Sequence, residues 1–516
     1  MEKGSDSSVA ESIGGHPGGQ DREVHVNRVR IASGVVRGVS DGAVRRFFSV
    51  PYAAPPVGEN RFAPPQPVPF WEAERDAMRP GPCAPHRIRD FPAIDITPLV
   101  GRGGEQDGDY LTLNIWTPET ASGAPVMLFI HGGGFVGGSK DAAVHDGSAF
   151  ARSGVVCVAI NYRLGIEGFL PVPGAATNLG LRDMVAAMHW VHDNIAAFGG
   201  DPDNVTVFGE SAGAMAIADL LTSPLADGLF RRAIVQSGHG SMVREIPVAR
   251  RLVRKLAAIL GVTADVEGFR RVGLERVWKA MEKVAKPFAR INLRDATGHE
   301  PVFGISRFVP VIGDEVLPEH PLRALANGAG ANIDLLIGTN SAEMNLYFVP
   351  TKVREKIPGW LARWMVGKSN PNARRALAAY GLGTKGKKPG HAMTEALSDL
   401  VFRWPARQFA AAHRGRTHVY EFDWHSPALG GELGACHGIE LPFVFDTLTS
   451  VTGPHGLAGE APPQGLAQRV HHLWVQFATD GSLPWPEFEA GSRKVHRLAS
   501  DETVEEPVMP AAAFLP

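Results

Sequence analysis

Five short apolar runs, separated by longer stretches with helical spacing, constrain the fold of this 516-residue chain more than any other feature. The runs are 126–130 (VMLFI), 155–160 (VVCVAI), 205–208 (VTVF), 233–236 (AIVQ) and 333–337 (IDLLI). Such runs, which lack a polar alternation, are typical of strands buried on both faces. Segments such as 181–198 (LRDMVAAMHWVHDNIAAF) between them place apolar residues near helical spacing. The alternation predicts an α/β fold with a parallel, doubly wound sheet.

The amino-terminal quarter of the chain has a different pattern. Residues 28–120 contain alternating segments interrupted by glycine and proline, which favour antiparallel strands at one edge of a mixed sheet. No internal repeat or interdomain linker is found, so residues 25–516 are predicted to form a single domain. Residues 1–24 are polar and rich in glycine and serine, and we expect a disordered tail there.

Composition excludes several classes of function. Lys and Arg number 52 against 54 Asp and Glu, a formal net charge of -2, so we expect no nucleic-acid partner and no membrane partner. No window reaches eighteen apolar residues, and the first twenty residues lack the apolar core of a secretory signal; the predicted location is cytoplasmic. The three cysteines (Cys83, Cys157 and Cys436) have no zinc-site spacing, and Cys157 is interpreted as a buried apolar residue. Oligomeric state is left open.

One serine stands between two glycines immediately after a predicted strand. In the segment VTVFGESAGAMAIADLL, Gly209 and Gly213 flank Ser211 at a spacing of two on each side. This spacing is that of a nucleophile elbow, in which a serine occupies a strained turn between a strand and a helix, where neighbouring glycines remove Cβ clashes. The pattern alone is weak, but the preceding strand and following helix favour a nucleophilic role for Ser211.

A serine nucleophile needs oxyanion donors, and a second glycine-rich segment can supply them. The loop HGGGFVGG at 131–138 follows the strand VMLFI and matches the HGGG-type loop of esterases and lipases. We assign the oxyanion hole to the amides of Gly133, Gly134 and Ala212. The alternatives are a flexible glycine loop or a phosphate-binding loop, but the Lys and Ser/Thr of a P-loop are missing. His131 is interpreted as a packing residue.

The base and the acid are less clear from spacing. In proteins with this elbow the acid and then the histidine follow the serine along the chain, in loops after later strands. Glu343 follows IDLLIG, and His437 lies in GACHGIELPFVF after THVYEFDW. The local pattern does not exclude other histidines, namely His425, His471 and His472.

Taken together, the motifs resemble the type-B carboxylesterase family, which also contains the cholinesterases. The similarity spans about 36–488 and includes FFSVPYAAPPVGENRFAPPQP (47–67), DYLTLNIWTP (109–118), NYRLG (161–165), NLGLRD (178–183), FGGDPDNVTVFGESAGA (198–214) and ATDGSLPWPEF (478–488). The resemblance implies an α/β-hydrolase fold, with a large, mixed, mostly parallel central sheet flanked by helices and with helical cap insertions. It also implies ester hydrolysis through Ser211, Glu343 and His437 and an acyl-enzyme, with a small-molecule ester as substrate and no cofactor or metal.

The chain departs from the family pattern in informative places. Ala342 and Met344 flank the acid where the family has Asp and Gly, so the loop must accept a side chain there. Tyr110 replaces a common cysteine, which leaves Cys83 without its usual disulfide partner and agrees with a reducing compartment. No tryptophan lies between Cys83 and Asp109, so a cation–π site for choline is not expected, and the chain is not predicted to be a cholinesterase.

Other residues are given structural interpretations. Glu210 is expected to point away from the site, and Arg163 with Asp183 to form a structural ion pair. Trp360, Trp364 and Trp424 are expected to pack in the core.

Two functional alternatives stay open. Relatives that lost the serine act as binding proteins, and a retained triad could also cleave amides, carbamates or long-chain lipids. We expect short to medium acyl esters, because no long exposed apolar lid is evident. Pocket-forming residues in 85–105, 265–305 and 350–395 are not assigned.

Overall fold

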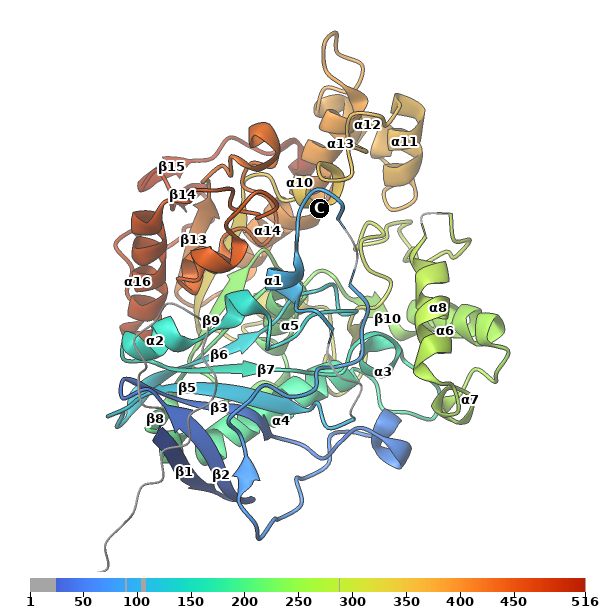
Figure 1. Ribbon diagram of the computed structural model, residues 1–516. Helices are drawn as coiled ribbons and strands as arrows, with labels where there is room; N and C mark the ends of the chain where they lie inside the picture. The colour runs from blue at the N-terminus through green and yellow to red at the C-terminus, as the bar shows by residue number, and fades with distance from the viewer. Residues whose placement is uncertain (1–24, 89–90, 104–107, 287, 516) are drawn as a thin grey trace, which may run out of the picture.

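The computed structural model describes residues 25–88, 91–103, 108–286 and 288–515. The predicted amino-terminal tail therefore lies outside the described residues. A 13-stranded sheet runs through the molecule, with helices on both faces (Figure 1). Its strand order is β1-β2-β3-β5-β7-β6-β8-β9-β12-β13-β14-β15, with β4 paired to β2.

All five predicted strands form the centre of this sheet. They are β7 (Val156–Ile160), β6 (Ala124–Ile130), β8 (Gly200–Glu210), β9 (Arg232–Gln236) and β12 (Asp334–Asn340), which lie side by side in that order. Each neighbouring pair is parallel, as the apolar runs predicted. The carboxyl ends of these strands therefore meet at one edge, where loops can bring distant residues together.

Antiparallel strands occupy the amino-terminal side of the sheet, as expected from residues 28–120. β1 (His25–Ile31), β2 (Gly34–Ser40), β3 (Val44–Pro51) and β5 (Thr112–Pro118) pair antiparallel in sequence, and β5 pairs antiparallel with β7. β4 (Arg75–Asp76) pairs parallel with β2. At the other side β13 (Thr417–Phe422) and β14 (Lys494–Arg497) continue the parallel pairing, and β15 (Glu502–Glu505) ends it antiparallel.

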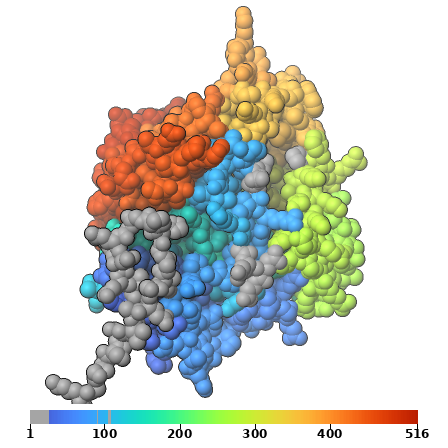
Figure 2. Space-filling view, in the orientation of Figure 1, coloured from blue at the N-terminus to red at the C-terminus, as the bar shows by residue number. Residues whose placement is uncertain are grey.

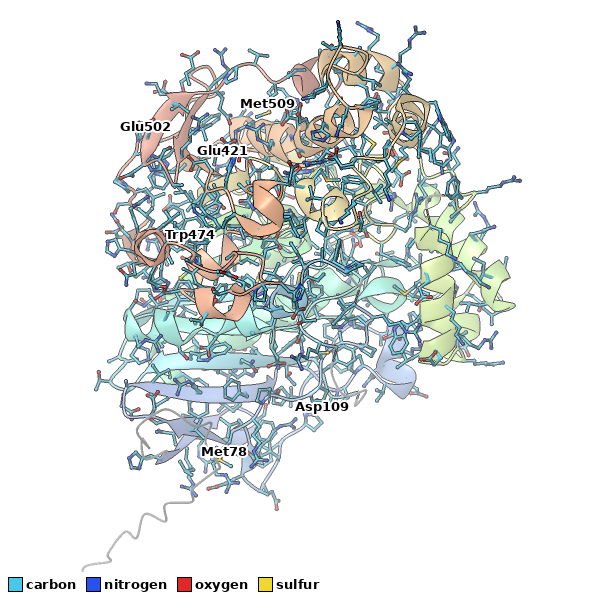
Figure 3. All side chains as sticks on the ribbon, turned by 45° about the horizontal axis from the view of Figure 1, so that its top comes forward. Met78, Asp109, Glu421, Trp474, Glu502 and Met509 are labelled. Atoms are coloured by element: carbon cyan, nitrogen blue, oxygen red, sulfur yellow. The ribbon has the colours of Figure 1, made fainter. Side chains whose placement is uncertain are left out.

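Two apolar cores lie on the two faces, because successive residues of a buried strand point to opposite sides. Leu128 packs into the core that contains Met184 of α4 (Leu179–Asn194) and α5 (Ala212–Leu220), and the next residue, Phe129, packs into the other. That second core contains α2 (Ser148–Arg152) and α16 (Gln464–Asp480), whose Trp474 is fully buried (Figure 3). Both faces of the central strands are thus covered.

Helical insertions form two lobes beyond the carboxyl edge of the sheet (Figure 1). One contains α6 (Ile246–Leu260), α7 (Val266–Arg270) and α8 (Leu274–Ala285), with β10 (Arg244–Glu245) paired to β11 (Val311–Ile312) nearby. The other contains α11 (Gly359–Gly367), α12 (Ala373–Ala379) and α13 (Pro389–Ser398). The remaining α-helices are α1 (Thr97–Val100), α3 (Gly165–Phe169), α9 (Pro321–Ala326), α10 (Asn345–Phe348), α14 (Trp404–Ala412) and α15 (Leu441–Val444). These lobes correspond to the predicted cap insertions.

The tryptophans of the second lobe correct one expectation. Trp360 is 68% exposed and Trp364 37% exposed, so neither packs in the core as predicted. Both lie on the outward face of α11, since Ala362 and Val366 supply its buried face. Trp424 is half-buried and packs against Phe443, with ring centroids 5.0 Å apart.

Three further expectations concern the described residues. None of their helices is both long and apolar enough to cross a membrane. Cys83, Cys157 and Cys436 are buried and form no disulfide, and Cys157 is an apolar core residue as interpreted. Arg163 and Asp183 form a fully buried ion pair of 2.6 Å, which confirms their structural interpretation.

Candidate active site

Ser211 lies in the sharp turn that joins β8 to α5. Its backbone has φ 55° and ψ −122°, and its amide donates to the carbonyl of Gln236 on the neighbouring strand at 2.9 Å. A Cβ at Gly209 or Gly213 would lie 2.6 Å or 2.0 Å from the carbonyl oxygen of Ile130. Both glycines are therefore required by the close approach of β6, and the strained turn holds the serine at the end of the strand.

His437 and Glu343 lie next to this serine. Nε2 of His437 is 2.8 Å from Oγ of Ser211, and Nδ1 of His437 is 2.7 Å from Oε2 of Glu343. The loops after β12 and β13 supply Glu343 and His437, which are brought together although 94 residues separate them in the chain. All three side chains are buried. The structure thus places a hydroxyl, an imidazole and a carboxyl in one hydrogen-bonded line.

The Glu343 carboxylate is held from two sides. Its Oε1 accepts hydrogen bonds from Oγ of Ser237 at 2.7 Å and from the amide of Asn340 at 2.8 Å, which leaves Oε2 directed at the imidazole. The backbone of His437 also donates to the carbonyl of Glu343 at 3.2 Å. Met344, at the position where the family has glycine, has φ −77° and ψ −4°, so this loop accepts a side chain without strain.

The glycine-rich loop lies against the same serine. A Cβ at Gly132 would be 3.0 Å from Cβ of Ser211. Gly133 and Gly134 have φ of 108° and 63°, and the carbonyl of Gly133 accepts hydrogen bonds from the amides of Val136 and Gly137, both at 3.1 Å. Within the described part of the chain, the Gly133 and Gly134 amides donate to no backbone carbonyl. Ala212 is the first residue of α5, where an amide has no partner within the helix.

The other candidate histidines lie elsewhere. His425 and His472 are exposed, and His471 contacts Oγ of Ser153 at 3.0 Å and the carbonyl of Val444 at 2.8 Å. His131 stacks on the ring of Tyr162 at 4.5 Å, and burial lowers its pKa to about 3, so it is a neutral packing residue as interpreted.

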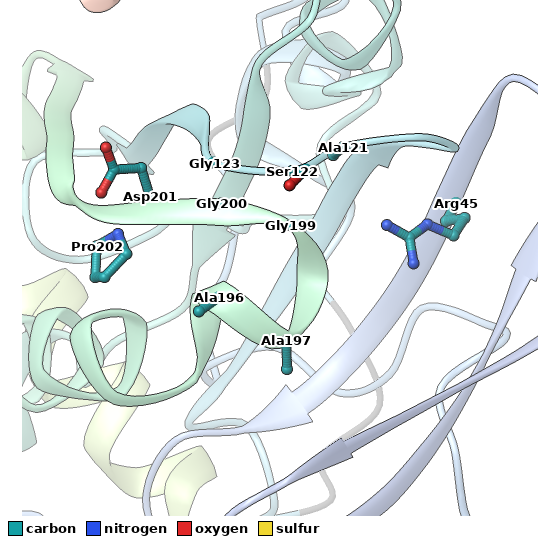
Figure 4. A pocket seen from close by; sticks show the side chains of 10 residues that line it. All are labelled: Arg45, Ala121, Ser122, Gly123, Ala196, Ala197, Gly199, Gly200, Asp201 and Pro202. Atoms are coloured by element: carbon teal, nitrogen blue, oxygen red, sulfur yellow. The ribbon is translucent and has the colours of Figure 1, made fainter.

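A surface hollow of about 400 Å³ lies at the opposite edge of the sheet, where β6 and β8 begin (Figure 4). Arg45 and Asp201 are its only charged lining residues, and it contains no nucleophile with an adjacent base. It is therefore separate from the site at Ser211.

The model of the carboxylesterase family matches residues 25–509, nearly the whole described chain. The chain belongs to the carboxylesterase family. The para-nitrobenzyl esterase of Bacillus subtilis is 36% identical over 489 residues, covering 92% of this chain and 94% of the relative. A phenmedipham hydrolase of Pseudarthrobacter oxydans is 33% identical and covers 92% and 95%. A solved structure of a PNB esterase has a TM-score of 0.80 at 32% identity, covering 95% of this chain and 99% of that chain.

Membership confirms the α/β-hydrolase fold and the class of reaction that the motifs predicted. This carboxylesterase is a serine hydrolase of carboxylic esters. Groups of three or more His, Cys, Asp or Glu side chains that could hold a metal ion are not found among the described residues.

Glu210 corrects a prediction about this carboxylesterase. Its carboxylate was expected to point away from the site, but Oε1 lies 3.1 Å from Nε2 of His437. The side chain turns inward because residue 210 ends a strand buried on both faces, where the loop at Gly132 and the residues around His437 enclose it. Burial raises the pKa of Glu210 to about 8. Burial alone would lower the pKa of His437, but Glu210 and Glu343 outweigh it and raise that pKa to about 9.

The sequence motifs did not indicate several residues around the site of this carboxylesterase. Two aromatic rings flank the imidazole of His437: Phe402 at 4.6 Å and Tyr347 at 5.7 Å between centroids. Phe402 lies in a π-helical turn, η5 (Asp399–Arg403), between α13 and α14. π-Helical turns are frequent at functional sites, but no local sequence pattern predicts them.

Hydrogen-bonding residues were missed for a related reason. Besides Ser237 and Asn340, they include Glu440, which accepts from Nδ2 of Asn340 at 2.6 Å, and Ser306, whose Oγ lies 2.7 Å from the carbonyl of Gly134. Only the packing of loops that are distant in sequence brings them to the site. The one available signal was position, since Ser237 directly follows the predicted strand at 233–236 and Asn340 lies three residues after the predicted strand at 333–337.

Proposed function

We propose that Ser211 is the nucleophile, His437 the general base and acid, and Glu343 the group that orients and stabilises the imidazole. In this mechanism Nε2 of His437 accepts the hydroxyl proton as Oγ attacks the ester carbonyl, and it then protonates the departing alcohol. Water hydrolyses the acyl-enzyme by the same proton transfers. The observation that carries the proposal is the continuous line from Ser211 Oγ through His437 to Glu343, at 2.8 Å and 2.7 Å.

The oxyanion hole is proposed to consist of the amides of Gly133, Gly134 and Ala212. Support comes from the loop that brings Gly132 against Ser211, and from the Ala212 amide at the start of α5, where the helix dipole also favours an anion. Each donor directed at the developing oxyanion can contribute about 3 kcal/mol to the transition state. Gly133 and Gly134 have positive φ, which glycine adopts more readily than any other residue.

The substrates are proposed to be neutral esters with short to medium acyl chains. The rings of Phe402 and Tyr347 support this range because both lie beside the imidazole, where they limit the space for a long chain. The three buried cysteines, which form no disulfide, support a cytoplasmic location, where thiols stay reduced. Faster hydrolysis of p-nitrophenyl laurate than of the butyrate would overturn the chain-length proposal.

The experiment that tests the proposed roles is hydrolysis of p-nitrophenyl butyrate by the purified protein and by its Ser211→Ala variant. A serine-directed organophosphate with intact-mass analysis gives an independent chemical readout. We expect activity and one covalent adduct in the parent and neither in the variant. Ser369→Ala is the matched control, because it also removes a buried serine hydroxyl, lies outside the line from Ser211 to Glu343 and should still form the adduct.

A contrary result is equally informative. A folded parent protein without activity or adduct would favour the noncatalytic binding function that some relatives of this fold have adopted. An adduct that persists in Ser211→Ala would assign the nucleophile to another residue.

A further inference from the structure

The lobe around α11 has a charge that differs strongly from that of the whole chain. Residues 352–388 contain ten Lys and Arg residues and one acidic residue, Glu355, whereas the entire chain has a net charge of -2. That overall net charge by itself predicts no anionic surface as a partner. Because the charged residues are distributed unevenly along the chain, the net charge of the whole chain does not describe this lobe.

Most of these cations have no acidic partner within ion-pair distance in the described part of the chain. The exposed ones are Lys352, Lys356, Arg363, Arg374, Arg375 and Lys385. The nearby acidic groups are already engaged: Glu355 pairs with Lys388 at 2.8 Å, and Glu395 pairs with Lys387 at 2.5 Å. The lobe therefore presents positive charge that its own carboxylates do not neutralise.

Large aromatic side chains lie exposed among these cations. Trp360 and Trp364 are one helical turn apart on the outward face of α11, and Arg363 is exposed beside them. Phe288, 73% exposed, stacks on Trp364 with ring centroids 5.2 Å apart. Lys368 places its Nζ 4.0 Å from the centre of the Trp364 ring. The face is an aromatic surface bordered by the basic side chains of Arg363 and Lys368.

The lobe also projects from the body of the protein. Figure 1 shows α11 and α12 as an outer layer beyond the carboxyl edge of the sheet, and Figure 2 shows the same segment, in yellow-orange, standing out at the top. A projecting surface reaches a flat partner before the rest of the molecule does. Aromatic rings that enter the headgroup region and cations that contact anionic lipids are the two components of peripheral binding to an interface.

We propose that the outward face of α11, with its basic border, docks the enzyme on an anionic lipid–water interface. Trp360 and Trp364 enter the headgroup layer, and Lys352, Lys356 and Arg363 contact lipid phosphates. Duplex nucleic acid is bound mainly through charge, and a second copy of the chain carries the same positive charge, so neither accounts for exposed rings beside cations. Single-stranded nucleic acid also combines aromatic stacking with cations and is therefore an outcome of the test. This inference is independent of the roles proposed for Ser211, Glu343 and His437.

The test is co-sedimentation of the full-length protein with vesicles of phosphatidylcholine alone, or with about a third phosphatidylglycerol. We expect binding to the anionic vesicles only, and weaker binding as salt is raised. Trp360→Ala/Trp364→Ala should weaken binding on the order of tenfold, since apolar contact with the interface is lost. Lys352→Glu/Lys356→Glu/Arg363→Glu should weaken it by at least about fivefold for each charge.

Two matched controls lie elsewhere on the chain. Phe70→Ala removes another aromatic side chain that is 68% exposed, like Trp360. Arg250→Glu/Arg254→Glu/Lys255→Glu reverses three exposed cations on α6, which has no exposed aromatic residue. Both controls should bind anionic vesicles nearly as the parent does. Hydrolysis of a soluble butyrate ester by every variant verifies folding and keeps this test separate from that of the active site.

Three results would overturn the proposal: equal binding to neutral and anionic vesicles, equal losses in the controls and the α11 variants, or no binding at all. Analytical ultracentrifugation tests the alternative that a second copy of the chain binds at the α11 face. A dimer in the parent that dissociates in Trp360→Ala/Trp364→Ala would assign this face to self-association instead. Likewise, if this face binds single-stranded RNA and does not bind vesicles, its partner is a nucleic acid and not a lipid interface.

Discussion

The carboxylate of Glu210 lies 3.1 Å from Nε2 of His437, the same ring nitrogen that lies 2.8 Å from Oγ of Ser211. Burial favours a proton on Glu210, whose pKa rises to about 8, and the carboxylates favour a proton on His437, whose pKa rises to about 9. The two groups therefore titrate as a pair. Because His437, as the proposed general base, must be neutral to accept the proton of Ser211, this pairing should control the pH at which the enzyme becomes active.

Replacing Glu210 with glutamine should move the acidic limb of the kcat/KM profile to lower pH. The wild-type carboxylate favours the imidazolium, so its loss lowers the pKa of His437 from about 9 towards the ordinary value. We expect a displacement of about one pH unit or more. The measurement is kcat/KM for p-nitrophenyl butyrate from acidic to alkaline pH.

Glu440→Gln is the comparison for this profile. Glu440 is also a buried carboxyl group that raises the pKa of His437, but its contribution ranks below those of Glu210 and Glu343. The limb should therefore move less in Glu440→Gln. An unchanged limb in Glu210→Gln would show that His437 does not respond to this carboxylate.

Gly133 and Gly134, two adjacent glycines of the proposed oxyanion hole, should respond very differently to alanine. A Cβ at Gly133 would lie 2.2 Å from the carbonyl oxygen of Gly137, and φ of 108° is unfavourable for any side chain. At Gly134 the nearest atom would be 4.0 Å away, and φ of 63° costs alanine about 1–2 kcal/mol. Gly133→Ala should lower kcat about 10²- to 10³-fold, and Gly134→Ala less than about tenfold. Organophosphate titration corrects both rates for the fraction of competent sites; equal losses would contradict the assignment.

The sequence predicted those parts of the site whose conformation depends on neighbouring residues in the chain, and it did not predict those that depend on distant segments. The strained turn at Ser211 was predictable because strand, flanking glycines and helix are contiguous in the sequence, although the Ile130 carbonyl that excludes a Cβ at Gly209 and Gly213 belongs to another strand. Glu343 and His437 needed the family resemblance, because a loop carboxylate or imidazole has no local signature. The orientation of Glu210 was predicted wrongly, since it depends on loops packed around residue 210 from distant parts of the chain.

Ser306→Ala should lower kcat with little change in KM. The Ser306 hydroxyl lies 2.7 Å from the carbonyl of Gly134 and 2.8 Å from that of Phe308, and with one hydrogen it donates to one of them at a time. Donation to Gly134 fixes the peptide that follows the proposed oxyanion donors. Because those donors act mainly in the transition state, we expect about a tenfold loss in kcat.

Ser306→Thr is the matched rescue for this prediction because it keeps the hydroxyl. Steady-state kinetics of both variants with p-nitrophenyl butyrate separate kcat from KM. A loss in KM alone, or threonine no better than alanine, would mean that this hydroxyl only fills space.

Asp183→Ala should destabilise the fold much more than removal of an exposed partner. Asp183 accepts hydrogen bonds from the backbone amide of Arg163 at 3.0 Å, from its Nε at 2.8 Å and from its Nη2 at 2.6 Å, and both side chains are fully buried. Alanine would leave a buried guanidinium unpaired, which costs about 3–5 kcal/mol. The exposed pair of Arg28 with Glu74, 2.7 Å apart, makes Glu74→Ala the control, with a change within about 0.5 kcal/mol. Urea unfolding of both variants measures the difference. A loss below about 1 kcal/mol in Asp183→Ala would show that water or another acceptor reaches Arg163, in which case the pair does not anchor the loop between β7 and α3.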